Sequence, residues 1–274
     1  MWGIVTAVDQ PLSGLRFSLV GPGRVGLSLA RWAEAAGARR IVTAGREDET
    51  PGTAGQDLLL IAVPDAALAE VAARLSRHPQ AAVALHTSGS LDASVLAPLR
   101  AGGSAVGSLH PLKAFPRPLP DPAQARGVFF AVDGDPAARE TAFRLAAAWG
   151  AVAGEVPAAA RLLYHFAASL AAGGAVTLLA AAAEIAGRLG LPPEVGRGYL
   201  ELCRGAVAAA LEAVEAGAPI ASAITGPAAR GDHATVARQL AALKEVAPEK
   251  VPLAEALVEE TLRQVALTPR PHRR

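Results

Sequence analysis

Polar side chains recur every fourth residue in one otherwise apolar stretch, RLLYHFAAS, at Arg161, His165 and Ser169. Residues four apart lie on one face of a helix, so these three would form a polar stripe. An arginine can hold a carboxylate through two hydrogen bonds, and a histidine can exchange a proton near neutral pH. We therefore expect Arg161 to bind a substrate carboxylate and His165 to act as an acid. The alternative is that both only satisfy polar partners at a domain junction.

A second histidine competes for the role of the acid. His110 follows an apolar run in GSLHPLKAF, with Lys113 three residues later. Ligands bind outside the carboxyl ends of the strands in open α/β sheets, and a strand ending near residue 109 would place His110 there. Tyr164, next to His165, is expected to point elsewhere on the helix and to belong to the core. The sequence thus leaves two candidate acids, His110 and His165.

Three glycines stand between an apolar run and a helix-like run in RFSLVGPGRVGLSLARWAEAAG. They match G-x-G-x-x-G, in which the first glycine allows a tight turn, the second lets the backbone approach a pyrophosphate, and the third lets helix and strand pack closely. The N-terminus of the following helix would offer free N–H groups and a positive dipole end to the phosphates. The alternative is a glycine-rich turn that binds nothing. We predict a dinucleotide site formed by Gly21, Pro22, Gly23, Arg24, Val25 and Gly26.

The residue after the second strand distinguishes the two dinucleotides. An acid there, about 20 residues beyond the glycines, would hold the ribose 2′-hydroxyl of NAD. The chain has Arg46 at that place, followed by Glu47. Because arginine pairs with phosphate through two hydrogen bonds, Arg46 favours NADP, with Arg24 as a second cation. Glu47 leaves NAD as the alternative.

Two further strand ends should line the same crevice. DLLLIAVPD (57–65) is a nearly continuous apolar run stopped by proline, as in a parallel strand buried on both faces, and it places Val63 and Pro64 on the ligand side. ALHTSGS (84–90) ends the next strand with hydroxyl groups. Thr87 and Ser88 would either face the cofactor or cap the helix that follows Leu91.

Short apolar runs alternate with helix-like stretches in the first part of the chain, which is typical of βαβ units around a parallel sheet. We predict strands near 16–20, 39–44, 57–63, 82–87, 104–109, 127–132 and 151–155, and helices near 24–36, 65–76, 92–99 and 136–149. Alanine- and leucine-rich stretches follow, broken near 190–194, 217–219 and 225–232, with Asp232 as the expected cap of the last break. The expected architecture is an α/β Rossmann-type domain with a parallel sheet over residues 1–157 and an all-α domain over residues 158–274.

Composition excludes several classes of protein. The 274 residues carry 26 basic and 25 acidic side chains, so no overall field attracts nucleic acid or an anionic membrane. The single cysteine excludes an intramolecular disulfide, and no cysteine or histidine spacing indicates a metal site. Residues 166–183 are uncharged, but their alanines and glycines favour a buried helix over a membrane helix. With no secretion signal visible at the N-terminus, we expect a cytoplasmic protein.

Six stretches occur in a recognisable order: the glycine loop, AVPD, HTSGS, LHPLKAF, LLYHFAAS and AITGPAARGDHATV. In these stretches the chain resembles the Rossmann-like proteins that carry a C-terminal domain of unknown function 2520, within the 6-phosphogluconate-dehydrogenase-like superfamily. The resemblance covers about residues 16–263. It implies an NAD(P)-binding N-terminal domain and a helical C-terminal domain that often dimerises. Relatives include pyrroline-5-carboxylate reductase, ketopantoate reductase and prephenate dehydrogenase, and no particular substrate is implied.

The chain departs from the pattern of that family at two positions. The pattern usually has lysine where this sequence has Arg161, and asparagine where it has Gly173. An arginine stays charged, so it can hold an anion but cannot donate a proton. Gly173 lacks the side-chain amide that would orient a substrate.

Together these features predict an NADP-dependent oxidoreductase that transfers hydride between NADP(H) and a small carboxylated keto or imino compound, and that forms a homodimer through its helical domain. A prephenate-dehydrogenase-like or ketopantoate-reductase-like activity is the nearest alternative among enzymes. A sensor or partner protein that binds NAD(P) without turnover is the alternative outside enzymes, and the two departures favour it. A scaffold that binds no nucleotide is the third.

Overall fold

The computed structural model describes residues 4–5, 12–45, 47–48 and 53–268. Arg46, the predicted reader of the 2′-phosphate, lies outside the described residues. The chain divides into two compact units, Met1–Ala172 and Gly173–Arg274, and each is described by itself. The predicted boundary after residue 157 falls where the sheet ends, whereas the first compact unit also includes the next helix.

The first unit is built on one eight-stranded sheet with the strand order β1-β8-β7-β6-β5-β4-β2-β3. Pairing is parallel from β3 through to β6 and between β7 and β8, and it is antiparallel between β6 and β7 and between β1 and β8. The predicted parallel sheet is therefore confirmed for most of its strands. Their bounds are β1 Ile4–Val5, β2 Arg16–Val20, β3 Arg39–Ala44, β4 Leu58–Ile61, β5 Val83–His86, β6 Ala105–Pro111, β7 Phe129–Gly134 and β8 Val152–Glu155.

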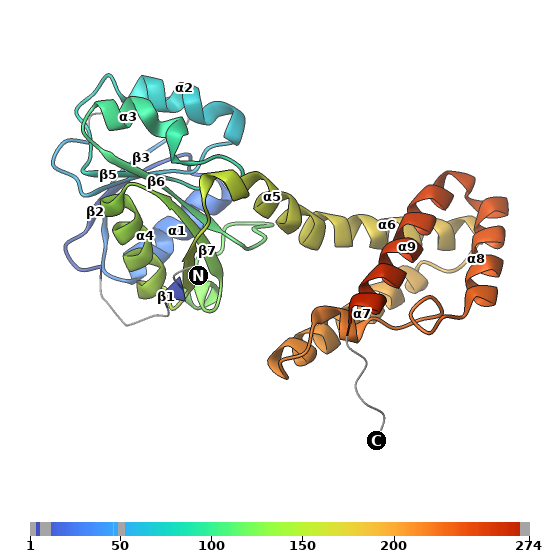
Figure 1. Cartoon of the computed structure of the whole chain (residues 1–274). Helices are drawn as coiled ribbons and strands as arrows, with labels where there is room; N and C mark the ends of the chain where they lie inside the picture. The colour runs from blue at the N-terminus through green and yellow to red at the C-terminus, as the bar shows by residue number, and fades with distance from the viewer. Residues whose placement is uncertain (1–3, 6–11, 46, 49–52, 269–274) are drawn as a thin grey trace. The chain divides into compact units, whose positions relative to one another are not determined.

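Helices cover both faces of this sheet: α1 (Arg24–Ala35) and α4 (Pro136–Ala148) lie on one face, and α2 (Asp65–Leu75) and α3 (Ala97–Ala101) on the other (Figure 1). Because successive strand residues point to opposite faces, each strand feeds two cores. In β4, Leu58 and Leu60 pack into the core shared with α1 and α4, and Leu59 and Ile61 into the core shared with α2 and α3. Burial on both faces explains why this segment of the sequence is uninterruptedly apolar.

The helix after the sheet, α5 (Ala158–Ser169), belongs to the first unit and runs through a π-helical turn (Leu170–Gly174) into α6 (Ala175–Arg188). By length and composition, the continuous helix Ala158–Arg188 is apolar enough to cross a membrane, and only 6% of its most apolar window is buried in the single chain. Phe166 is 59% exposed and Val176 66%. The prediction that residues 166–183 form a buried helix is thus wrong for the single chain, because an apolar sequence does not specify what covers it.

The second unit is all helical, as predicted. It contains α6, α7 (Glu194–Glu215), α8 (His233–Val246) and α9 (Val251–Leu267), with the short 3-10 turns η4 (Ile220–Ala223) and η5 (Pro248–Lys250). Asp232 caps α8 as expected, since its carboxylate accepts from the N–H of Thr235 at 3.0 Å. Of the described residues of this unit, only Ala186 and Ala247 are buried.

Candidate functional site

The glycine loop lies where the order of the parallel strands reverses. β2 pairs with β3 on one side and with β4 on the other, so the chain leaves β2 in one direction and β4 in the opposite direction. Open α/β sheets bind ligands at such a switch point, outside the carboxyl ends of the strands. Gly21 directly follows β2, and Val63 and Pro64 follow β4. The structure therefore brings these predicted residues to one place.

The three glycines of the loop differ in how much room surrounds them. A Cβ on Gly21 would lie 2.5 Å from the carbonyl oxygen of Ala62, and one on Gly26 only 2.3 Å from the carbonyl oxygen of Gly21. Gly21 also has a φ of +87°, which other residues rarely adopt. A Cβ on Gly23, in contrast, would meet no heavy atom within 4 Å. The fold thus requires Gly21 and Gly26, and it does not require Gly23.

Helix α1 begins at Arg24 with an open N-terminus. Its N-cap residue, Gly23, offers no side-chain hydrogen bond, and the first turn contains no acidic residue. The unpaired N–H groups of this turn and the positive end of the helix dipole are suited to an anion. Pro22, Gly23 and Arg24 are exposed, while Val25 is half-buried against the core. The Arg24 side chain reaches the carbonyl oxygen of Pro116 at 3.4 Å.

A cavity of about 380 Å³ opens beside the start of α2. It is lined by Glu47, Pro64, Ala66, Ala67, Glu70 and Val71. Pro64 precedes the first residue of α2, so the cavity lies on the carboxyl side of β4, as the glycine loop does. Two carboxylates, Glu47 and Glu70, lie in its wall.

The loop after β5 is held by its own side chains. Thr87 continues the strand ladder, since its N–H donates to the carbonyl of Ile61. The buried hydroxyl of Ser88 accepts from the N–H groups of Ser90 (3.2 Å) and Leu91 (3.1 Å). In this structure Ser88 therefore caps a turn within the loop, whereas the following 3-10 turn is capped by Asp92.

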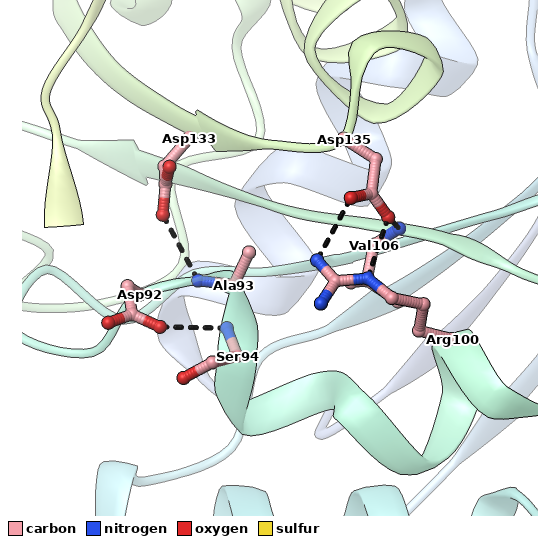
Figure 2. A network of polar contacts seen from close by, with 7 residues as sticks. All are labelled: Asp92, Ala93, Ser94, Arg100, Val106, Asp133 and Asp135. Atoms are coloured by element: carbon pink, nitrogen blue, oxygen red, sulfur yellow. Dashed lines mark hydrogen bonds and ion pairs between the residues drawn. The ribbon is translucent and has the colours of Figure 1, made fainter.

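Acidic side chains fix the far end of this loop (Figure 2). Asp92 accepts from the N–H of Ser94 at 2.7 Å, and Asp133, on β7, accepts from the N–H of Ala93 at 3.1 Å. Two residues further on, Asp135 binds Arg100 through both carboxylate oxygens and also accepts from the N–H of Val106. Hydrogen bonds thereby join the 3-10 turn after the loop to β7, and Asp135 joins helix α3 to β6.

His86, at the end of β5, was not predicted as a site residue. Its Nδ1 accepts from the N–H of Ser88 at 3.2 Å, so Nε2 carries the proton and donates to the carbonyl of Asp92 at 3.1 Å. Burial, together with the nearby cation of Arg161, lowers the pKa of His86 to about 4. The signal for it was a histidine closing a fully buried strand in ALHTSGS.

Arg161 reaches the same loop from α5. Its side chain has no exposed surface, and its Nη2 donates to the carbonyl oxygen of Ser88 at 2.7 Å. Its Nε and Nη1 are buried and have no hydrogen-bond partner within the described ranges, and burial lowers the pKa of the guanidinium. Among the described residues it forms no ion pair. A buried cation therefore contacts the loop through Nη2, and its Nε and Nη1 remain as donors.

The two candidate acids meet at Gly89. The rings of His110 and His165 contact edge to face, with centroids 5.4 Å apart. A Cβ on Gly89 would lie 2.7 Å from Nε2 of His110 and 2.4 Å from Nδ1 of His165. The structure thus brings together two residues that the sequence offered as alternatives.

Tyr164 does not belong to the core, contrary to expectation. It is half-buried, and its hydroxyl lies 3.0 Å from Nδ1 of His110. Consecutive helical residues point about 100° apart, so Tyr164 and His165 can both reach His110 because that ring lies between them. The third member of the stripe, Ser169, is exposed and donates to the carbonyl of His165 on its own helix.

No group of three or more histidine, cysteine, aspartate or glutamate side chains is placed to hold a metal ion in the part of the chain that the structure describes. The arrangement offers instead two imidazoles in contact, a phenol and a buried guanidinium. Such a set can hold or donate a proton next to an anionic group.

Comparison with known proteins was consistent with this architecture. A family model described as a domain of unknown function (DUF2520) matches residues 128–265, and a Rossmann-like domain model matches residues 29–111. The chain belongs to the DUF2520 family. No curated protein matches it in sequence.

Solved structures share the fold of this DUF2520 protein at low sequence identity. BF3122 from Bacteroides fragilis, provisionally named an NADP oxidoreductase, has a TM-score of 0.71 at 19% identity, covering 92% of this chain and 99% of that one. TM1727 from Thermotoga maritima has a TM-score of 0.68 at 22% identity (91% and 98%). A Plasmodium falciparum pyrroline carboxylate reductase, solved with NADP bound, has a TM-score of 0.58 at 15% identity (92% and 99%).

Proposed function

We propose that this DUF2520 protein is an NAD(P)-dependent oxidoreductase, with NADP as the preferred dinucleotide, acting on the carbonyl or imine group of a small carboxylated compound. The observation that carries the proposal is the contrast among the three glycines. Gly21 and Gly26 are required by packing, whereas Gly23 faces open space at an exposed helix N-terminus. A glycine that the fold does not need fits a backbone that a pyrophosphate must approach.

The residues present fit a dinucleotide in two further respects. The N–H groups at the start of α1 would hold the pyrophosphate, and the cavity beside Pro64 has room for the adenosine half. Glu47 in the wall of that cavity supports NAD as the alternative cofactor, while the contact between Arg46 and a 2′-phosphate stays a prediction. The bound dinucleotide supplies or accepts hydride.

The chain's own residues would handle the proton and the charge. His110 and His165, which meet at Gly89 in the loop between β5 and the first 3-10 turn, would donate to the carbonyl oxygen or imine nitrogen. Arg161 has no exposed surface, so in this proposal it acts on the substrate carboxylate through its positive field. Direct contact would require Nε or Nη1 to become exposed.

The first test is titration of the purified protein with NADPH and with NADH, followed by nucleotide fluorescence. Gly23→Val should abolish binding while the melting temperature stays unchanged, because its side chain would occupy the pyrophosphate position. Arg46→Ala should weaken NADPH binding and leave NADH binding as it was. Failure of the unaltered protein to bind either nucleotide, or full binding by folded Gly23→Val, would overturn the proposal.

A second candidate function is an NAD(P)-binding sensor without turnover. The complete burial of Arg161 favours it. The family pattern usually has a lysine at this position, which could donate a proton, whereas an arginine stays charged and, when buried, does not contact a substrate. A sensor would bind NADPH as above but would not oxidise it with any acceptor in a panel of keto acids and cyclic imines. His110→Gln and His165→Gln would then leave NADPH binding unchanged and have no turnover to reduce.

We further propose that the protein is a cytoplasmic homodimer formed through the second unit. Among the described residues of that unit only two alanines are buried, which is too little for helices α6–α9 to stabilise one another. Large apolar side chains are exposed instead: Leu178, Leu202, Val207, Leu211, Val214 and Ile220. Apolar surface of this extent is typical of a face that another chain covers.

Light scattering tests the dimer, and cell fractionation tests the cytoplasmic location. We expect the mass of two chains in the soluble fraction, and we expect Leu202→Lys with Leu211→Lys to shift the protein towards monomer and lower its melting temperature. Arg204→Lys, on the same helix, is the matched control and should leave the dimer intact. A monomer with unchanged stability, or recovery in the membrane fraction, would contradict the proposal.

A further inference from the structure

We propose that Tyr164 is a positioning residue for His110: its hydroxyl donates to Nδ1, which places the ring proton on Nε2, the nitrogen that lies beside Gly89. There it would donate to the substrate oxygen or nitrogen that gains charge. The role in turnover rests on the proposed function. The tautomer itself does not, because it is a property of the protein without substrate.

The contact joins two elements that are remote in the sequence. Tyr164 lies on α5 and His110 on β6, 54 residues earlier, and the hydroxyl lies 3.0 Å from Nδ1. The two rings are perpendicular, with centroids 5.6 Å apart. This geometry holds the imidazole from one side and leaves its opposite nitrogen, Nε2, without a hydrogen-bond partner among the described residues.

Counting donors and acceptors decides the direction of this hydrogen bond. If the tyrosine donates, the phenol proton and the Nδ1 lone pair satisfy each other, and one donor, Nε2–H, is left for a ligand. If the histidine donates from Nδ1, the phenol proton and the Nε2 lone pair are both left without a partner among the described residues. The first arrangement leaves fewer unsatisfied groups, and it leaves the one group that a developing negative charge requires.

The surroundings keep both partners neutral. Burial, together with the neighbouring His165 and Arg161, lowers the pKa of His110 to about 4, and burial raises the pKa of Tyr164 to about 12. Asp65 acts on His110 in the opposite sense, and His86 in the same sense as Arg161. Near neutral pH, His110 is thus an uncharged imidazole whose N–H can donate, a role known for catalytic histidines of lowered pKa.

Nε2 of His110 lies so close to Gly89 that no side chain fits between them. The missing side chain of Gly89 would lie 2.7 Å from Nε2 of His110 and 2.4 Å from Nδ1 of His165. Nδ1 of His165 is buried and has no hydrogen-bond partner in the described part of the chain. The two histidines are therefore not equivalent: His110 has its proton fixed by a hydrogen bond, and His165 does not. The geometry points to His110 as the donor.

The test is the tautomer of His110, read from the ¹⁵N resonances of its ring near pH 7 in the full-length protein without ligand. The His110→Gln spectrum identifies the signals. We expect an unprotonated Nδ1 and a protonated Nε2 in the unaltered protein, and a shift towards the average of the two tautomers in Tyr164→Phe. Tyr199→Phe, which removes the only other phenol hydroxyl in the chain, should leave the His110 resonances unchanged.

A protonated Nδ1 in the unaltered protein, or identical His110 resonances in Tyr164→Phe, overturns the inference. Nucleotide titration of Tyr164→Phe keeps this test separate from the proposed function, since we expect NADPH affinity equal to that of the unaltered protein. Once an acceptor is found, Tyr164→Phe should lower kcat about tenfold or more with little change in KM, as for other residues that orient an acting histidine. Full kcat in this variant would also overturn the inference.

Discussion

Arg161 donates a hydrogen bond of 2.7 Å to the carbonyl oxygen of Ser88, 73 residues earlier in the chain. This bond joins the helix after the sheet to the loop after β5, on which the two candidate acids converge. It also places a permanent positive charge beside the buried imidazole of His86 and the half-buried imidazole of His110. A cation at this position disfavours the protonation of either ring.

Arg161→Met should raise the pKa of His86. The cation is removed while burial, the larger cause, remains, so the pKa should rise from about 4 but stay below 6.5. An NMR titration of the His86 ring measures it. Arg161→Lys, which keeps the charge and matches the residue usual in the family, is the control and should leave the pKa low. An unchanged pKa in Arg161→Met would contradict the assigned role of this cation.

The free energy of unfolding should fall as the pH is lowered from about 6.5 to about 4. The unfolded chain binds a proton on His86 near 6.5, whereas the folded chain does so only near 4, so acid favours the unfolded state in this window. Above about pH 7 the contribution is constant. The loss from His86 is on the order of 3 kcal/mol.

Melting temperatures across this pH range test the expectation. His86→Gln does not titrate, and it can still donate to the carbonyl of Asp92, so it should make the acid side of the profile less steep and leave the part that comes from His110, whose pKa is also lowered to about 4. His78→Gln, at an exposed position, is the matched control and should follow the unaltered protein. A profile that is equally steep in His86→Gln would assign the acid sensitivity to other groups.

Gly26→Ala should destabilise the protein, whereas Gly23→Ala should weaken nucleotide binding without loss of stability. A Cβ on Gly26 would lie 2.3 Å from the carbonyl oxygen of Gly21, so helix α1 must move, at a cost of about 1–3 kcal/mol. A Cβ on Gly23 meets nothing and should leave the melting temperature unchanged while it weakens NADPH binding. Chemical denaturation and nucleotide titration of both variants measure this. Equal stability of the two variants would show that the close approach at Gly26 is not required.

Gly89→Ala should displace the two imidazoles while leaving nucleotide binding intact. The added methyl group would lie well inside the contact distance of both rings, so His110 or His165 must turn away. We expect changed ¹⁵N resonances for both histidines and an NADPH affinity equal to that of the unaltered protein. Gly205→Ala, on a helix with open space, is the control and should stabilise by about 0.5–1 kcal/mol. Unchanged histidine resonances in Gly89→Ala would contradict the convergence at this position.

The elements of the sheet could be predicted because local pattern determines them. The predicted strand at 16–20 and the predicted helix at 24–36 agree with the structure to within a residue. The two-residue strand β1 was not predicted, since Ile4–Val5 is too short to show an alternation. The antiparallel pairing of β6 with β7 was also not predicted, because strand direction depends on the path of the chain between the strands.

The site was predicted only in part. Arg161, His165 and His110 were selected from their spacing and their place after a strand, and the structure brings all three to one loop. Which of them are buried could not be known, because a polar stripe on a helix gives no information about the surface it meets. His86 and Tyr164 were missed for the same reason: each acts through a partner more than one element away or through a backbone group.

The loop after β5 has no regular secondary structure, yet side chains hold much of its backbone. The N–H groups of Ser88, Ser90, Leu91, Ala93 and Ser94 all donate to side chains, and those side chains come from the loop itself and from β5 and β7. An irregular segment fixed in this way is rigid in the manner of a strand. A ligand that settles against Gly89 therefore meets a preformed surface, and its affinity is not reduced by the conformational entropy of ordering a loop.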